Sequence, residues 1–362
     1  MKTKENQLVT GRREALKIFG LGSAALLMGD LGRIPSIATY EMAPKKNPVV
    51  PAGRSKVAFT SGTDRRAMIF EVMEPFKDKI RKDLKGKQLV IKPNMVSTKV
   101  PLCATHVDAI RGLLEYITPI YNGQVIIAEA SNGETTPGFE NYGYLTLQKD
   151  YDIKFIDLNK TNGNPIWILD NNLYPQKIQV ASMFLDPGNY IISISRLKTH
   201  NAVIMTAGTK NMVMAAPIII YGVDGQKPLS YKRMMHGGGS RWLHYNMFQV
   251  AQHVHANFTI IDGVEGMEGN GPSGGTAVDH RIALAGEDAL AIDSLCAKLM
   301  GIPLEDLGYL QYCAADGLGI IDREKIDIIG SKDPDKYVIP YKLHENIATQ
   351  LQWKEPLIPA KK

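Results

Sequence analysis

The chain has 362 residues, 44% of them hydrophobic, and a formal net charge of +5. This composition predicts a folded protein with a substantial core, but it excludes the strongly basic surface of a nucleic-acid-binding protein. Much of the charge belongs to residues 1–38, where six basic and three acidic residues give +3. Cys103, Cys296 and Cys313 lie far apart, so the sequence predicts no disulfide framework and no four-cysteine iron–sulfur cluster.

The first segment has the features of an export signal. Arg12 and Arg13 lie in a sequence that resembles the twin-arginine motif, and the apolar run Ile18–Met28 is too short to span a bilayer. Small residues at 36–38 offer a cleavage site. We therefore expect residues 1–38 to be a signal peptide that the twin-arginine translocase recognises, and the protein to be periplasmic or otherwise exported. The alternative is a cytoplasmic helix with a chance arginine pair.

Strands and helices alternate in the folded region. Residues 39–54 are predicted to form a linker, and residues 331–362 a C-terminal tail. Short apolar runs predict strands at 56–59, 88–91, 125–128, 153–156, 190–194, 258–261, 282–285 and 326–329. Helical spacing of apolar residues predicts helices at 65–82, 106–117, 203–215, 242–256 and 288–300. The alternation predicts one α/β domain over residues 55–330, with a mostly parallel sheet and helices on both faces.

Polar side chains follow two of these strands, at the edge where parallel sheets bind ligands. Lys92 and Asn94 offer a cation and an amide to a substrate carboxylate or phosphate. Lys198, Thr199 and His200 offer a cation, a hydroxyl and an imidazole that is a candidate general base or metal ligand. The alternatives are a solvated lysine at a strand end and a helix cap at Thr199.

An acidic, glycine-rich stretch follows the predicted strand at 258–261. Asp262, Glu265 and Glu268 lie close together among glycines, so we expect a mobile loop whose carboxylates repel one another unless a cation or a shared proton compensates them. We predict all three as ligands of a divalent metal, with Glu265 also acting as acid or base. The alternative is a solvated loop. His236 lies beside three glycines and is expected to act as a lid residue.

Asp293 lies inside an apolar helical pattern, between Ile292 and Leu295. A buried carboxylate without a partner is costly, so the sequence predicts a partner for it. We expect that partner to be a structural hydrogen bond.

Several motifs together resemble the family called domain of unknown function 362. They are Lys92-Pro93-Asn94, Arg196 to His200, Lys210-Asn211-Met212, Asp262 to Pro272, and Asp293. The resemblance spans roughly residues 56–329 and implies a fold and the place of a site. It implies no reaction, because the activity of the family is not established. Some members carry cysteine clusters for iron–sulfur centres, which this chain lacks, so we expect no such cluster.

Two hypotheses about function remain open. In the first, the chain is an enzyme for a small anionic substrate, with catalytic and binding groups drawn from Lys198, His200, Glu265, Lys92, Asn94, Thr199 and His236. In the second, it is a non-catalytic binding or accessory protein, exported folded with a redox partner. A polar cleft with perturbed carboxylates would favour the enzyme, whereas an exposed apolar patch without such a cleft would favour the accessory role.

Overall fold

The computed structural model describes residues 53–222 and 227–355. The predicted signal peptide at 1–38 and nearly all of the predicted linker lie outside the described residues. None of the helices in the described ranges is long and apolar enough to cross a membrane.

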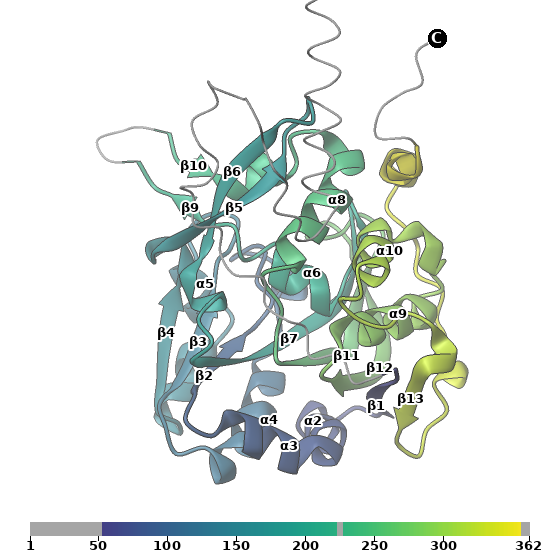
Figure 1. Cartoon of the computed structure of the whole chain (residues 1–362). Helices are drawn as coiled ribbons and strands as arrows, with labels where there is room; N and C mark the ends of the chain where they lie inside the picture. The colour runs from purple at the N-terminus through teal and green to yellow at the C-terminus, as the bar shows by residue number, and fades with distance from the viewer. Residues whose placement is uncertain (1–52, 223–226, 356–362) are drawn as a thin grey trace, which may run out of the picture.

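A nine-stranded mixed sheet forms the centre of the fold (Figure 1). Its strands run in the spatial order β13-β1-β12-β11-β7-β2-β3-β4, and β8 pairs with β7. In chain order they are β1 (Ser55–Ser61), β2 (Gln88–Lys92), β3 (Val125–Glu129), β4 (Ile153–Asp157), β7 (Asn189–His200), β8 (Ile204–Thr206), β11 (Phe258–Glu268), β12 (Thr276–Gly286) and β13 (Ile326–Ile329). Two small antiparallel ribbons pair β5 (Gly163–Leu169) with β6 (Pro175–Ala181), and β9 (Ile219–Ile220) with β10 (Leu229–Ser230).

Most neighbouring strands in the sheet are parallel. The run β11-β7-β2-β3-β4 is parallel throughout, as is β1 with β13. Only β12, between β1 and β11, and the short β8 pair in the antiparallel sense. The carboxyl ends of β2, β3, β7 and β11 therefore lie along one edge, as the strand–helix alternation predicted.

Helices cover both faces of the sheet, which confirms the predicted α/β class. Successive residues of a strand point to opposite sides of the sheet. In β2, Leu89 and Ile91 accordingly belong to one apolar core and Val90 to the other. The first core is closed by α2 (Arg65–Met73), α3 (Lys77–Leu84), α4 (Val107–Ile117) and α5 (Thr136–Asn141). The second is closed by α6 (Gly208–Val213), α8 (Gly239–Ala251), α9 (Ala289–Leu299) and α10 (Gly308–Ala315). Two short helices are α7 (Tyr231–Met235) and α11 (Ile347–Gln350).

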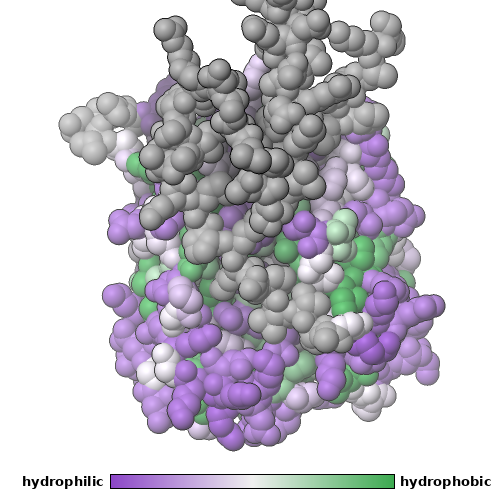
Figure 2. Space-filling view, viewed as in Figure 1, coloured by the Kyte–Doolittle hydropathy of each residue, from purple (hydrophilic) through white to green (hydrophobic). Residues whose placement is uncertain are grey.

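The surface over α2, α3 and α4 is mostly hydrophilic where it is visible (Figure 2). These helices therefore bury one face against the sheet and leave the other to solvent. The helix predicted over 65–82 is divided into α2 and α3 by a short 3₁₀ turn that contains Pro75. Proline lacks the N–H that a continuous helix would need.

Two predicted elements are corrected by the structure. The acidic, glycine-rich stretch is not a loop, since β11 continues to Glu268 and pairs in antiparallel register with β12, with a bulge between Gly263 and Glu265. The helix predicted over 203–215 is divided, because Ile204–Thr206 pairs with the end of β7 as β8 before the helix α6 begins. In both places antiparallel pairing with the adjacent strand along the chain overrides the local pattern.

Residues after β13 return to the body of the protein. Tyr341 is buried, and its hydroxyl lies 2.9 Å from His280 Nδ1. The Gln350 side chain is fully enclosed and accepts the Ile204 N–H at 2.6 Å. This segment therefore packs against β8 and the β11–β12 hairpin.

Candidate functional site

A cavity of about 840 Å³ lies at the carboxyl edge of the parallel strands. Lys92 and Asn94 reach it from the end of β2, Glu129 from the end of β3, and His200 from the end of β7. Lys210 and Asn211 of α6, Lys232 and Arg233 of α7, and Pro272 and Ser273 of the β11–β12 turn complete much of its wall. The cavity thus unites segments from most of the described chain.

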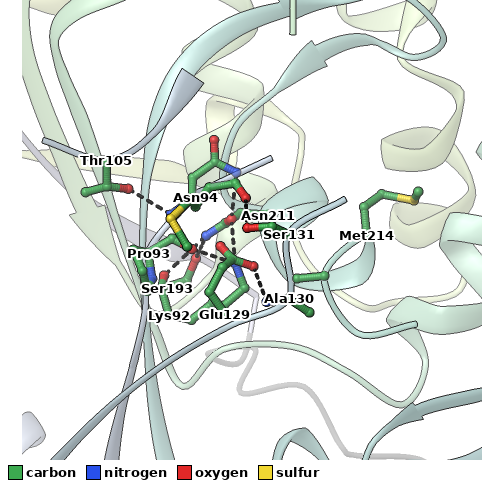
Figure 3. A network of polar contacts seen from close by, with 12 residues as sticks. Lys92, Pro93, Asn94, Thr105, Glu129, Ala130, Ser131, Ser193, Asn211 and Met214 are labelled. Atoms are coloured by element: carbon green, nitrogen blue, oxygen red, sulfur yellow. Dashed lines mark hydrogen bonds and ion pairs between the residues drawn. The ribbon is translucent and has the colours of Figure 1, made fainter. Parts of the chain in front are cut away.

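A network of hydrogen bonds joins Lys92, Asn94 and Asn211 (Figure 3), and one further bond extends it to Lys198. Lys92 Nζ donates to Asn211 Oδ1 at 3.0 Å, and that oxygen also accepts Asn94 Nδ2 at 2.9 Å. Asn94 Oδ1 in turn accepts Lys198 Nζ at 2.5 Å. Two amides therefore hold the two cations in a fixed arrangement, although Lys198 itself lies behind Asn94 and does not line the cavity.

Glu129 is the carboxylate that balances Lys92. Its Oε2 lies 2.7 Å from Lys92 Nζ, and its Oε1 accepts the Ala130 N–H at 2.7 Å. Both side chains are buried. Burial lowers the pKa of Lys92, and the Glu129 charge opposes that shift.

Four lysines in the described part of the chain are buried, and all belong to this region: Lys92, Lys198, Lys210 and Lys232. Burial, which disfavours the ammonium form, lowers the pKa of Lys198 to about 8 and that of Lys232 to about 7. The pKa of Lys210 is lowered well below its usual value by burial and by the charges of Lys198, Lys232 and Lys92. Amines that titrate near neutral pH are typical of functional sites.

Asp293 fixes the helix that carries Lys210. The Gly208 N–H donates to its Oδ1 at 2.7 Å and the Thr209 N–H to its Oδ2 at 2.9 Å. The prediction that this carboxylate makes a structural hydrogen bond is confirmed. Gly208 is required here because a Cβ would come within 2.5 Å of Thr259 Cγ2.

The remaining predicted groups on β7 and α7 have different surroundings. Thr199 is buried and its hydroxyl donates to Gly269 O at 2.9 Å, so it ties β7 to the hairpin turn. His200 lines the cavity, and its Nδ1 accepts the Ala202 N–H at 3.0 Å. Burial, aided by the Lys210 charge, lowers the pKa of His200 well below its usual value, so the ring is neutral at neutral pH. His236 lies exposed at the cavity wall just after α7.

The three carboxylates of β11 lie outside the cavity lining, and each has a partner in the chain. Asp262 pairs with Arg65 at 3.2 Å, and Glu265 with the buried Arg196 at 3.1 Å. Glu268 Oε2 accepts the Lys342 N–H at 2.9 Å. Within residues 53–222 and 227–355, no three His, Cys, Asp or Glu side chains are grouped as metal ligands. Asp262 and Glu265 thus each have an arginine of the chain as a counter-charge.

The sequence left three groups of the site without a role. Glu129 was visible at the end of a strand, and Lys210 as part of the Lys210-Asn211-Met212 motif. Nothing in the sequence indicated that Lys232 belongs to the site, because the residues around it show no helical or strand periodicity. In the fold its ammonium group donates to the carbonyls of Met214 and Ala215 at 3.0 Å each.

Fold and site together define a three-layer α/β protein with a cation-rich cavity at the strand ends. Residues 89–298 match the family described as Domain of unknown function (DUF362), and the chain belongs to that family. A thylakoid-associated protein of Synechocystis sp. is 21% identical over 217 residues, which cover 59% of this chain and 63% of that protein. The chain therefore spans less than two thirds of the length of this relative.

Two solved structures align with part of this chain at low sequence identity. The lactate racemase apoprotein of Thermoanaerobacterium thermosaccharolyticum aligns with 70% of this chain and 59% of its own, at 12% identity and a TM-score of 0.40. A protein of Thermotoga maritima aligns with 58% of this chain and 53% of its own, at 12% identity and a TM-score of 0.41.

Proposed function

We propose that this protein is an enzyme that acts on a small anionic molecule bound in the cavity at the carboxyl ends of β2, β3 and β7. The observation that carries this proposal is the charge of the lining. Five basic residues line the cavity, namely Lys92, Lys99, Lys210, Lys232 and Arg233, against two acidic residues, Glu129 and Glu134. A carboxylate or phosphate would compensate this excess of positive charge.

The acidic residues of the lining are already paired with lysines. Glu129 is bound to Lys92 at 2.7 Å, and Glu134 lies 3.3 Å from Lys160. Lys210 and Lys232 have no carboxylate within ion-pair distance among the described residues. An anion in the cavity would therefore meet two buried amines that the protein itself leaves without a counter-charge, in a setting where charge-assisted hydrogen bonds are strong.

The polar cavity supports the enzyme over the alternative of a non-catalytic accessory protein. Lys232 lines the cavity with a pKa of about 7, so it can give or take a proton at neutral pH, which is what general acid–base catalysis requires. A protein that only docks on a redox partner has no need of such groups. The proposal assigns no metal to Asp262, Glu265 or Glu268, because these carboxylates do not line the cavity.

Thermal unfolding and calorimetric titration with citrate, inorganic phosphate and neutral glycerol test the anion site. We expect the two anions to raise the melting temperature and glycerol to have no effect. Lys232→Met should weaken anion binding by about tenfold or more, the usual worth of one charge-assisted hydrogen bond. The matched control is Lys298→Met, whose side chain pairs with Asp335 instead of lining the cavity. Equal shifts with anions and glycerol would contradict the proposal.

We also propose that the chain is exported folded through the twin-arginine pathway. The support is the sequence Arg12-Arg13 followed by the apolar run Ile18–Met28. Replacing both arginines with lysine keeps the positive charge, so a change in export would not be caused by a change in net charge. We expect the double variant to remain in the cytoplasm in folded form. Unchanged export of this variant, measured by fractionation, would reject the assignment.

A further inference from the structure

Lys210 differs from the other three buried lysines in having no partner. Lys92 is bound to Glu129, Lys198 to Asn94 and the Cys103 carbonyl, and Lys232 to two backbone carbonyls. The side chain of Lys210 is 7% exposed and lines the cavity. In the described part of the chain its amine makes no hydrogen bond and no ion pair.

A buried ammonium ion without a partner is strongly disfavoured, so this amine gives up its proton more easily than an exposed lysine does. Burial is the largest cause that lowers the pKa of Lys210, and the nearby charges of Lys198, Lys232 and Lys92 act in the same direction. A neutral amine has a free lone pair. A lysine that is desolvated and placed beside other cations is the form in which lysine acts as a nucleophile.

The protein also fixes the position of this amine. The N-terminus of α6 is bound to Asp293 through the N–H groups of Gly208 and Thr209. The next residue along the helix, Asn211, donates from Nδ2 to Ser193 Oγ at 2.9 Å and accepts Lys92 Nζ at Oδ1. Lys210 is thus carried by a short helix that is held to the sheet and to α9, which is the support that a reacting group requires.

We propose that Lys210 is a nucleophile that forms an imine with a small aldehyde or ketone bearing a carboxylate or phosphate group. This inference rests on the proposed function, because the anionic group would occupy the cation-rich lining while the carbonyl carbon meets the amine. It goes further by naming the reacting residue and the chemical class of the substrate, a carbonyl compound with a negative charge.

The reaction balances without any oxidant or reductant. The lone pair of Lys210 Nζ forms the C–N bond, the carbonyl π electrons move to oxygen, and a proton passes from nitrogen to that oxygen. The nitrogen lone pair then forms the C=N bond while the C–O bond breaks and the hydroxyl leaves as water after taking up a proton. The resulting iminium nitrogen loses its remaining proton, so an amine and a carbonyl become an imine and one water.

Lys232 is suited to manage the proton in the second step. It lines the same cavity, and its charge acts on Lys210. Burial lowers the pKa of Lys232 to about 7, so at neutral pH it exists both as an ammonium donor and as a neutral acceptor. It can therefore protonate the departing hydroxyl and recover the proton from the iminium nitrogen.

Trapping with borohydride tests the proposal on the unmodified full chain. The protein is incubated at pH 7 with glyoxylate, a small aldehyde that carries a carboxylate, and then reduced with sodium borohydride, which converts an imine into a stable secondary amine. Peptide mapping by mass spectrometry locates the label. We expect Lys210 to carry at least tenfold more label than exposed lysines such as Lys154, since an ordinary lysine with a pKa of about 10.4 is almost wholly protonated at this pH.

Controls separate this inference from the anion site. Protein unfolded in urea should lose the preference for Lys210, and excess citrate should protect Lys210 in the folded protein. If citrate raises the melting temperature but the label falls evenly on exposed lysines, or on Lys92 or Lys232, the imine assignment is overturned and the anion site stands. If citrate has no effect on stability or on labelling, the anion site fails, and the inference that depends on it fails too.

Discussion

Lys92 Nζ and Glu129 Oε2 lie 2.7 Å apart at the carboxyl ends of adjacent parallel strands, and both side chains are almost completely enclosed. The pair anchors the cavity wall, because Lys92 also donates to the Pro93 carbonyl at 2.5 Å and to Asn211. A buried charge of this kind depends on its counter-charge for stability.

Glu129→Gln should therefore lower the free energy of unfolding by about 3–5 kcal/mol at pH 7, the usual cost of leaving one partner of a buried pair alone. Burial lowers the pKa of Lys92 and Glu129 opposes that shift, so the variant should lose less stability at pH 9, where Lys92 deprotonates more easily. Urea denaturation at both pH values measures this.

Two further variants check the cause of that effect. Lys92→Met combined with Glu129→Gln should cost less than the sum of the single changes, since the unpaired charge is removed. Asp335→Asn removes the exposed partner of Lys298 and should cost less than about 1 kcal/mol. If the stability losses of Lys92→Met and Glu129→Gln are additive in the double variant, the ion pair does not couple the two residues.

Lys232→Met should change the pH dependence of stability. Burial, with a smaller effect of the Lys92 charge, lowers the pKa of Lys232 to about 7, while Glu129 and Asp157 oppose the shift. Between about pH 7 and the unfolded pKa of about 10.4, the unfolded state binds more protons at this site than the native state, so the contribution of Lys232 to stability rises with pH. The stability of the variant relative to the wild type should therefore fall from pH 7 to pH 9. Parallel curves from urea denaturation would contradict the assignment.

Asp293→Asn should weaken both the fold and the anion site. The change replaces one of the two oxygens that accept N–H groups at the start of α6 with an amide N–H donor, which we expect to cost about 1–3 kcal/mol. Because α6 carries Lys210 and Asn211, citrate affinity should also fall. Asp288→Asn is the matched control, since Asp288 caps α9 by the same kind of bond but does not line this cavity. Loss of citrate binding in both variants would indicate a general loss of folding.

Lys92→Met and Lys198→Met should each weaken anion binding, and the double variant should lose less than the sum of the two losses. The two ammonium groups act on the cavity through the Asn94 and Asn211 amides, so removing one already disturbs the arrangement that the other depends on. Titration with citrate measures all three affinities. Fully additive losses would show that the lysines act independently.

Glu268→Gln tests the role of the hairpin carboxylates. Its Oε2 accepts the Lys342 N–H, and the glutamine oxygen can still accept that bond, so we expect a change of at most about 1 kcal/mol. Mg²⁺, Mn²⁺, Ni²⁺ and Zn²⁺ should shift the melting temperature equally in variant and wild type. A metal-induced shift that occurs only in the wild type would support the metal ligation predicted from the sequence.

The edge of the sheet at which the site lies could be predicted from the sequence. Lys92, Asn94 and His200 follow apolar runs, and parallel strands bring their carboxyl ends together whatever the distance along the chain. The same argument applied to Asp262 was wrong about the loop, because glycine content does not show that β12 pairs with the whole stretch. Gly266 instead makes room for the Tyr341 hydroxyl, a contact made by residues far apart in sequence.

The two lysines that line the cavity from α6 and α7 could not be placed from the sequence. Lys210 belongs to a pattern that favours one long helix over 203–215, whereas pairing of β8 with β7 delays the helix and sets the direction of its side chains. Lys232 belongs to α7, a helix of five residues. Helices this short are stabilised by tertiary contacts, which no local periodicity reports.

The bonds that hold the cavity together join residues 119 positions apart for Lys92 and Asn211, and 104 positions apart for Asn94 and Lys198. Contacts at such separation close long loops, so the cavity depends on the ordering of the whole chain between these residues. A ligand in it binds the finished protein and not its partly folded forms, and every bound molecule shifts the population toward the native state. Anion binding in this cavity therefore reports whether Lys92, Asn94 and Asn211 have come together.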